Sequence, residues 1–268
     1  MSVIGVTMVR DEADVIGSVV RHMLTQCDAV IVADNLSSDG TRQILDAVED
    51  PRLTVLDDLD PAYEQSRKMT TLAEVAADMG AAWVVPFDAD EIWLSRLGRI
   101  ADVLPTVGVP AIAPAPIFNH WATGHDDQAE ADPFRRLRWR WTDPLPLFKV
   151  AVTTSPRLRI HMGNHGADYG AEPVARIDGL LEVRHFPYRD PDQFVRKAVQ
   201  GAAALRMADL PEGAGAHWRQ YADLAASEGP QALADWWRRY FYHPDPTSGV
   251  QPDPDQAHQR MVYDPVPL

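Results

Sequence analysis

The sequence of 268 residues contains a single cysteine, Cys27. This excludes an intramolecular disulfide and a zinc site built from several thiolates. No run of 18 uncharged apolar residues occurs, so we expect no membrane-spanning helix. The first residues lack a basic stretch followed by a long apolar one, so we expect no signal peptide and a cytoplasmic protein.

Basic residues are scarce relative to acidic ones. The chain has 25 Lys and Arg against 39 Asp and Glu, which gives a formal net charge of -14. A nucleic-acid partner is therefore not expected, because it would need a basic face. An anionic small ligand is still compatible, since local charge can oppose the net charge. With 46% hydrophobic and 24% charged residues, the composition is typical of a soluble globular protein.

Short apolar runs alternate with helical patterns in the first third of the chain. The expected strands are 3–9, 29–34, 52–58 and 82–88, and the expected helices are 11–27, 37–50 and 61–80. This alternation predicts a mostly parallel sheet with right-handed crossovers and helices on both faces.

The rest of the chain has a different pattern. Further strands are expected near 110–118, 147–152, 158–168 and 180–189, followed by helices. We therefore predict one α/β domain over 1–189, a helical segment over 190–243 packed on it, and an extended tail over 244–268.

Acidic residues follow each of the first four predicted strands. The densest group is Asp88, Asp90 and Glu91 in "FDADEIW", directly after a buried-type strand. Ligands of open α/β sheets bind at the carboxyl ends of strands. Carboxylates so close together repel each other unless a cation lies between them, and oxygen ligands suit Mg²⁺ or Mn²⁺. The alternative is that these acids cap a helix or are simply solvated.

Six segments give the chain a family resemblance. They are "MVRDEADVI", "VADNLSSDGT", "SRKMTTLAEVA", "FDADEIW", "MGNHGAD" and "LEVRHFPYRDPDQFVRKAVQG". In order and spacing they resemble a bacterial branch of the family-2-like glycosyltransferases with the GT-A fold. The resemblance implies a Rossmann-like α/β fold and transfer of a sugar from a nucleoside-diphosphate sugar, with UDP-sugars favoured. The acceptor would be a small molecule or a glycan.

The resemblance also implies roles for individual residues. The residues expected to bind the nucleotide sugar are Arg10, Asp11, Glu12, Asp34, Arg67, Asp88, Arg189 and Lys197. Mn²⁺ or Mg²⁺ would be bound by Asp88, Asp90 and His185, with His165 as an alternative histidine.

The general base has no clear equivalent in this sequence. The candidates are Asp127, with Asp126 beside it, and His120. Three other functions fit part of the pattern: a sugar nucleotidyltransferase, a catalytically inactive nucleotide-binding protein and a metal-dependent phosphohydrolase. A nucleotidyltransferase would need a glycine-rich loop after the first strand, where this chain has "VRDEAD".

Overall fold

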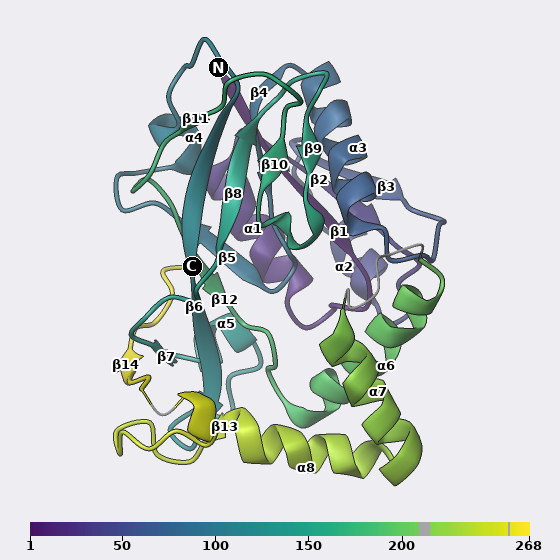
Figure 1. Ribbon diagram of the computed structural model, residues 1–268, viewed down its shortest axis with the longest axis vertical. Coiled ribbons are helices and arrows are strands. Elements are labelled where there is room, and N and C mark those ends of the chain that lie inside the picture. The colour runs from purple at the N-terminus through teal and green to yellow at the C-terminus, as the bar shows by residue number, and fades with distance from the viewer. Residues whose placement is uncertain (209–214, 257) are drawn as a thin grey trace.

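The computed structural model describes residues 1–208, 215–256 and 258–268. Its first third alternates strands and helices as predicted (Figure 1). In chain order these elements are β1 Ser2–Val9, α1 Ile16–Gln26, β2 Ala29–Asp34, α2 Thr41–Asp46, β3 Leu53–Asp57, α3 Gln65–Asp78 and β4 Ala81–Pro86. All four predicted strands are confirmed to within two residues, whereas α2 is shorter than the predicted helix at 37–50.

Strands β4, β1, β2 and β3 lie side by side in this order and are all parallel. The register pairs Val9 with Asp34 across β1 and β2, and Val6 with Pro86 across β1 and β4. Because the strands are parallel, the segments that follow them emerge at one edge of the sheet. The predicted mostly parallel α/β sheet flanked by helices is thus confirmed.

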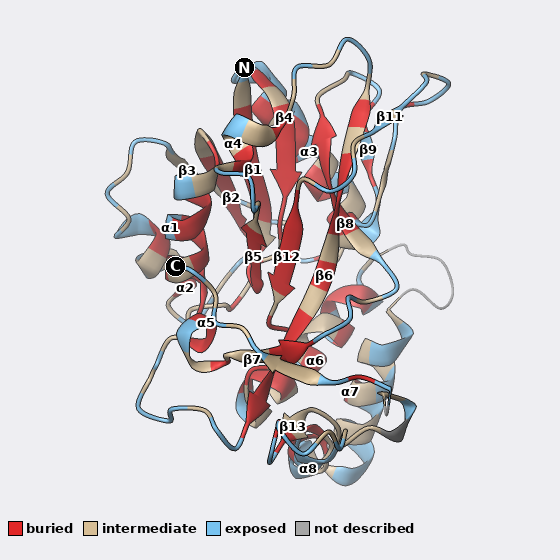
Figure 2. Cartoon of the chain, turned by 90° about the vertical axis from the view of Figure 1, so that its left-hand side faces the viewer, coloured by how far each residue is buried: buried red, intermediate tan, exposed pale blue. Residues whose placement is uncertain are grey.

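Both faces of this sheet are covered, which explains the unbroken apolar character of the strands (Figure 2). Side chains alternate along β1, so that Val3 packs on the α1 side and Ile4 on the α3 side. Helix α1 buries Val19 and Met23 at helical spacing, and α3 likewise buries one apolar face.

The second half of the chain adds mainly antiparallel strands. Its elements are β5 Glu91–Leu94, α4 Ile100–Val103, β6 Ala111–Thr123, α5 Pro133–Arg136, β7 Trp139–Trp141, β8 Phe148–Thr153, β9 Arg159–Ile160, η1 Met162–Asn164, β10 Ala167–Asp168, β11 Ala175–Arg176 and β12 Glu182–His185. Strand β8 joins β4 to the long β6, antiparallel to both. Strand β12 pairs with β5 and β6, and this pairing brings its end to the carboxyl end of β4.

Three helices and two short strands complete the fold. They are α6 Pro191–Arg206, α7 Ala216–Glu228, α8 Pro230–Tyr240, β13 Tyr242–His243 and β14 Met261–Tyr263, with the 3-10 turn η2 Pro254–Gln256. The three helices lie together beyond the carboxyl ends of the parallel strands (Figure 1). Part of the predicted helical segment, 209–214, and residue 257 of the predicted tail lie outside the described residues.

The predicted extended tail returns to the sheet. Strand β14 pairs with β7, and Asp264 forms ion pairs with Arg140 at 2.8 Å and Arg184 at 2.9 Å. In the described part of the chain, we find no helix with the length and apolar character needed to cross a bilayer.

Candidate functional site

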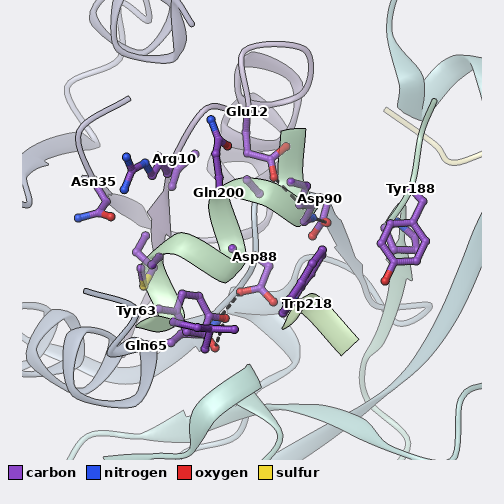
Figure 3. Close-up of a pocket in the computed structure, with 18 of the residues that line it drawn as sticks. Arg10, Glu12, Asn35, Tyr63, Gln65, Asp88, Asp90, Tyr188, Gln200 and Trp218 are labelled. Atoms are coloured by element: carbon purple, nitrogen blue, oxygen red, sulfur yellow. Dashed lines mark hydrogen bonds and ion pairs between the residues drawn. The ribbon is translucent and has the colours of Figure 1, made fainter. Parts of the chain in front are cut away.

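A cavity of about 330 Å³ opens at the carboxyl ends of β1, β2 and β4, where helices α6 and α7 cover it (Figure 3). Its volume is within the range of small-molecule sites. The described residues that line it are Met8, Val9, Arg10, Glu12, Asn35, Tyr63, Gln65, Asp88, Ala89, Asp90, His185, Pro187, Tyr188, Lys197, Gln200, Gly201, Ala204, Leu205, His217 and Trp218.

The turn after β1 brings the first acids to this edge. Asp11 has φ 54°, in the left-handed region, where residues other than glycine are uncommon. Its Oδ1 accepts a hydrogen bond from the backbone N–H of Ser38 at 2.6 Å, and its Oδ2 accepts one from Gln200 Nε2 at 2.6 Å. Asp11 therefore ties the loops after β1 and β2 to α6 and does not itself line the cavity.

Asp88, Glu91 and Lys149 form the closed cluster. Lys149 Nζ lies 2.5 Å from Asp88 Oδ2 and 2.7 Å from Glu91 Oε1. The other oxygen of Asp88 accepts hydrogen bonds from Gln65 Nε2 at 3.0 Å and Asn164 Nδ2 at 3.1 Å. Both carboxylate oxygens of Asp88 are thus occupied by nitrogen donors.

Burial dominates the electrostatics of the closed cluster. It raises the pKa of Glu91 to about 7; attraction by Lys149 opposes this rise, and repulsion by Asp88 and Asp90 adds to it. Burial lowers the pKa of Lys149, but the negative charges of Asp88 and Glu91 outweigh burial and raise this pKa above its usual value. The lysine therefore stays charged between its two partners.

Asp90, Glu12 and Lys197 form the open cluster, which lines the cavity. Lys197 Nζ contacts Asp90 directly and lies 3.5 Å from Glu12 Oε1, with 26% of its side chain exposed. Burial alone would raise the pKa of Asp90, but the positive charges of Lys197 and Arg189 outweigh burial and lower it. Asp90 is therefore ionised at neutral pH.

His185 ends β12 beside Asp90. Its Nδ1 lies 2.8 Å from Asn119 Oδ1, and its Nε2 lies 3.7 Å from Asp90 Oδ1. An oxygen acceptor at Nδ1 assigns the proton to that nitrogen, so the lone pair of Nε2 is directed towards Asp90. Burial lowers the pKa of His185 to about 4, which keeps the ring neutral at pH 7.

Asp90 and His185 can bind a divalent cation only if water and the phosphates of a substrate supply its other ligands. Among the described residues, no group of three or more His, Cys, Asp or Glu side chains converges on one point. Asp90 and His185 supply one oxygen and one nitrogen ligand on the same side of the cavity. Mg²⁺ and Mn²⁺ are commonly held by few protein ligands together with water and substrate phosphates. Asp88 does not fit the metal role expected for it, because its oxygens face Lys149, Gln65 and Asn164.

Six of the residues expected from the sequence meet in the cavity. They are Arg10, Glu12, Asp88, Asp90, His185 and Lys197. Arg10 has a buried Nε with no hydrogen-bond partner in the described part of the chain. A buried, unused donor is costly unless a ligand or water accepts from it.

Other expected binding residues lie outside the cavity lining. Arg67 is exposed on α3 and pairs with Glu64 and, at 2.5 Å, with Asp60. Arg189 is fully buried and binds Glu12 and Asp14, so it anchors the start of α6 to the loop after β1.

Asp34 also lies outside the lining. Its Oδ1 accepts from the N–H of Ser37 at 3.2 Å, and the next residue, Asn35, lines the cavity instead. His165, the alternative metal ligand, is exposed and has Nδ1 2.9 Å from the carbonyl oxygen of Phe148.

The structure does not bring either candidate base to the cavity. His120 is 1% exposed, stacks on Phe186 at a ring-centroid distance of 4.4 Å, and has its pKa lowered to about 3 by burial. Asp127 lies in an exposed turn, where its Oδ1 accepts from the N–H of Ala129.

Lys197 was expected at the site from the sequence, but Lys68 and Lys149 were not. The chain has three lysines, Lys68, Lys149 and Lys197, among its 25 basic residues. Each one forms an ion pair with an aspartate that follows a parallel strand, and the pair of Lys68 with Asp58 is 2.7 Å. Two features of the sequence could have indicated these roles. Lys149 is a charged residue inside the apolar run "LFKVAV", and lysine is scarce in the chain.

Comparison with known proteins places the chain in no family. No family model matches it, and no curated protein matches it. Among the similar solved structures is a "putative nucleotide-diphospho-sugar transferase" from Desulfovibrio desulfuricans G20, with a TM-score of 0.37 and 11% sequence identity. The match covers 82% of this chain and 99% of that chain. At this level of similarity the functional assignment depends on the site itself.

Proposed function

We propose that the chain is a metal-dependent glycosyltransferase that takes a sugar from a nucleoside-diphosphate sugar, with UDP-sugars favoured. The observation that carries this proposal is the open cluster together with His185. Asp90 and Lys197 of the open cluster and the neutral ring of His185 meet in one cavity at the carboxyl ends of parallel strands. Ligands of open α/β sheets bind at this position.

The cavity offers separate places for the parts of such a donor. Arg10 and Asn35 lie on one side of the acids, and Arg10 carries the unused Nε donor (Figure 3). The nucleoside would bind at that side. The diphosphate would then reach Lys197, whose partly exposed ammonium already faces the cavity. A lysine ammonium is a compact charge suited to phosphate oxygens.

Asp90 and His185 would hold Mn²⁺ or Mg²⁺ between them. A bound cation would neutralise charge on the leaving diphosphate. Lys197 would stabilise the same charge from α6, and neutral His185 needs to lose no proton before it can act as a ligand. In the closed cluster, Lys149 would hold Asp88 and the turn after β4 in place, so that Asp90 stays directed into the cavity.

Calorimetry with UDP-, GDP-, dTDP- and CDP-sugars tests the proposal. The titrations are made with Mn²⁺ and with chelator, on wild type, Asp90→Asn and the control Asp46→Asn. Asp46 is an exposed acid of α2 that pairs with Arg42. One nucleotide class should bind, and both chelator and Asp90→Asn should weaken its binding by about 100-fold, about 2.7 kcal/mol.

The control variant should bind as wild type does. Absence of binding by all four classes, or binding that ignores both metal and Asp90, would contradict the proposal. Release of nucleoside diphosphate that depends on an added acceptor would then separate a transferase from a phosphohydrolase.

A further inference from the structure

The cavity has a second end, which the proposed donor does not use. Trp218 of α7 and Tyr188 after β12 line it. Figure 3 shows Trp218 and Tyr188 on the side of Asp88 and Asp90 that faces away from Arg10 and Asn35. This end therefore combines aromatic walls with the acids of the open cluster.

The Trp218 ring packs between α6 and Tyr188. A Cβ added at Gly201 would lie 3.4 Å from Trp218 Cδ2, an ordinary van der Waals distance, so the indole lies against α6 at this position. The rings of Tyr188 and Trp218 meet edge to face, with centroids 6.3 Å apart and an interplanar angle of 82°. Contacts on two sides therefore hold the indole in place.

A pyranose ring has the surface that such a site recognises. One of its faces is mostly C–H and packs on an aromatic ring, while its hydroxyl groups need polar partners around the edge. Trp218 supplies the flat apolar surface. The exposed His217, whose ring centroid is 4.8 Å from that of Trp218, and Asp90, which lines the same cavity, supply polar groups.

We propose that Trp218 is the platform on which a saccharide acceptor stacks, which rests on the proposed glycosyl transfer. With the nucleoside near Asn35 and the diphosphate at Lys197, the transferred sugar would extend towards Trp218. An acceptor bound there presents a hydroxyl to the anomeric carbon. The new bond would form between that carbon and the hydroxyl oxygen as the bond to the diphosphate oxygen breaks. The hydroxyl proton would pass to water in the open cavity, and the bonding electrons would leave with the nucleoside diphosphate.

Three tryptophan variants test the platform by comparing loss of the ring, retention of a ring, and a control substitution elsewhere. Trp218→Leu keeps apolar volume against Gly201 but removes the ring, and Trp218→Phe keeps a ring. Trp236→Leu is the matched control, because Trp236 is a partly buried tryptophan of α8 outside the cavity lining. The probes are methyl α- and β-glycosides of glucose, galactose and mannose, added to protein loaded with Mn²⁺ and the nucleoside diphosphate that binds best.

Ligand-observed NMR should show saturation transfer to ring protons of at least one glycoside. Trp218→Leu should weaken that glycoside by about tenfold or more, whereas Trp218→Phe should stay within about threefold and Trp236→Leu should equal wild type. Nucleoside diphosphate affinity, measured by calorimetry, should be the same in all four proteins.

Three results would overturn this inference. They are wild type that binds the nucleoside diphosphate but no glycoside, glycoside binding that Trp218→Leu leaves intact, and a loss of nucleotide affinity in Trp218→Leu. The last would show that the indole stacks on the nucleobase instead. Failure of the proposed function itself has a different signature, since wild type would then bind none of the nucleoside diphosphates.

Discussion

The closed cluster and the open cluster have the same kinds of group but differ in access to solvent. In each, one lysine lies between two carboxylates next to the turn after β4. Lys149 has 5% of its side chain exposed, and its partner Glu91 has none. Lys197 has 26% exposed and faces the cavity. The contrast lies in the lysines, since Asp88 is 28% exposed and Asp90 5%. A buried lysine cannot exchange its partners for water or ligand, so Lys149 shapes the site, whereas Lys197 at the cavity wall can meet a ligand.

The largest effect should come from breaking the closed cluster. Lys149→Met leaves the fully buried Glu91 and the partly exposed Asp88 without their cation, which should lower the free energy of unfolding by about 3 to 5 kcal/mol. Lys197→Met is the counterpart in the open cluster. It should cost less, about 1 to 3 kcal/mol, because Asp90 is also buried, with 5% of its side chain exposed, but keeps the nearby positive charge of Arg189. Denaturant unfolding measures both, and equal losses would erase the distinction between the clusters.

The closed cluster should also make the free energy of unfolding depend on pH near neutrality. The pKa of Glu91 is raised to about 7 from 4.5, so between these values the native protein holds a proton that the unfolded chain has released. The contribution of Glu91 to stability therefore falls as pH rises through this window. Glutamine does not titrate, so Glu91→Gln should gain on the order of 2 kcal/mol relative to wild type between pH 5 and pH 7.5.

Denaturant unfolding at several pH values measures this gain. The control Glu74→Gln, at an exposed position of α3, should show a constant difference from wild type. A constant difference for Glu91→Gln as well would mean that Glu91 is not protonated near neutrality.

The smallest effect concerns metal binding at the open cluster. In the protein without ligand, the Lys197 ammonium neutralises Asp90 and Glu12 and so opposes binding of a second cation. Lys197→Met should bind Mn²⁺ alone about tenfold more tightly than wild type, about 1.4 kcal/mol. It should bind nucleoside diphosphates more weakly. Electron paramagnetic resonance of free Mn²⁺ measures the first change.

The double variant Lys197→Met with Asp90→Asn locates the ion. It should lose the gain in Mn²⁺ affinity, because the proposed oxygen ligand is gone. If Lys197→Met binds Mn²⁺ no better than wild type, Lys197 does not compete with metal at Asp90.

The four parallel strands and their order along the chain were predictable from local patterns. The apolar runs of β1, β2, β3 and β4 are unbroken because both faces of the sheet are covered. Acids placed after such strands predicted a polar edge, and six of the expected residues do line one cavity there. These inferences succeed because strand periodicity and strand ends are local properties of the sequence.

Long-range ion pairs were not predictable in the same way. Asp88 and Asp90 are two residues apart, yet one faces Lys149 and the other Lys197, which are 61 and 107 residues away. Arg189 resembles a ligand-binding arginine in sequence, but it is buried against Glu12, 177 residues away. No local pattern shows which cation reaches which acid, because that depends on how β8 and α6 pack at the sheet edge.

The sequence by itself thus determined the parallel sheet, its acidic edge and the types of group at the candidate site. The tertiary structure alone decided that Asp88 pairs with the buried Lys149 and Asp90 with the cavity-facing Lys197, because burial and distance set the charge of each group. It also decided that Trp218 of α7 lies in the cavity beside the acids. That placement depends on the packing of α7 against α6, two helices that the sequence could only show as separate.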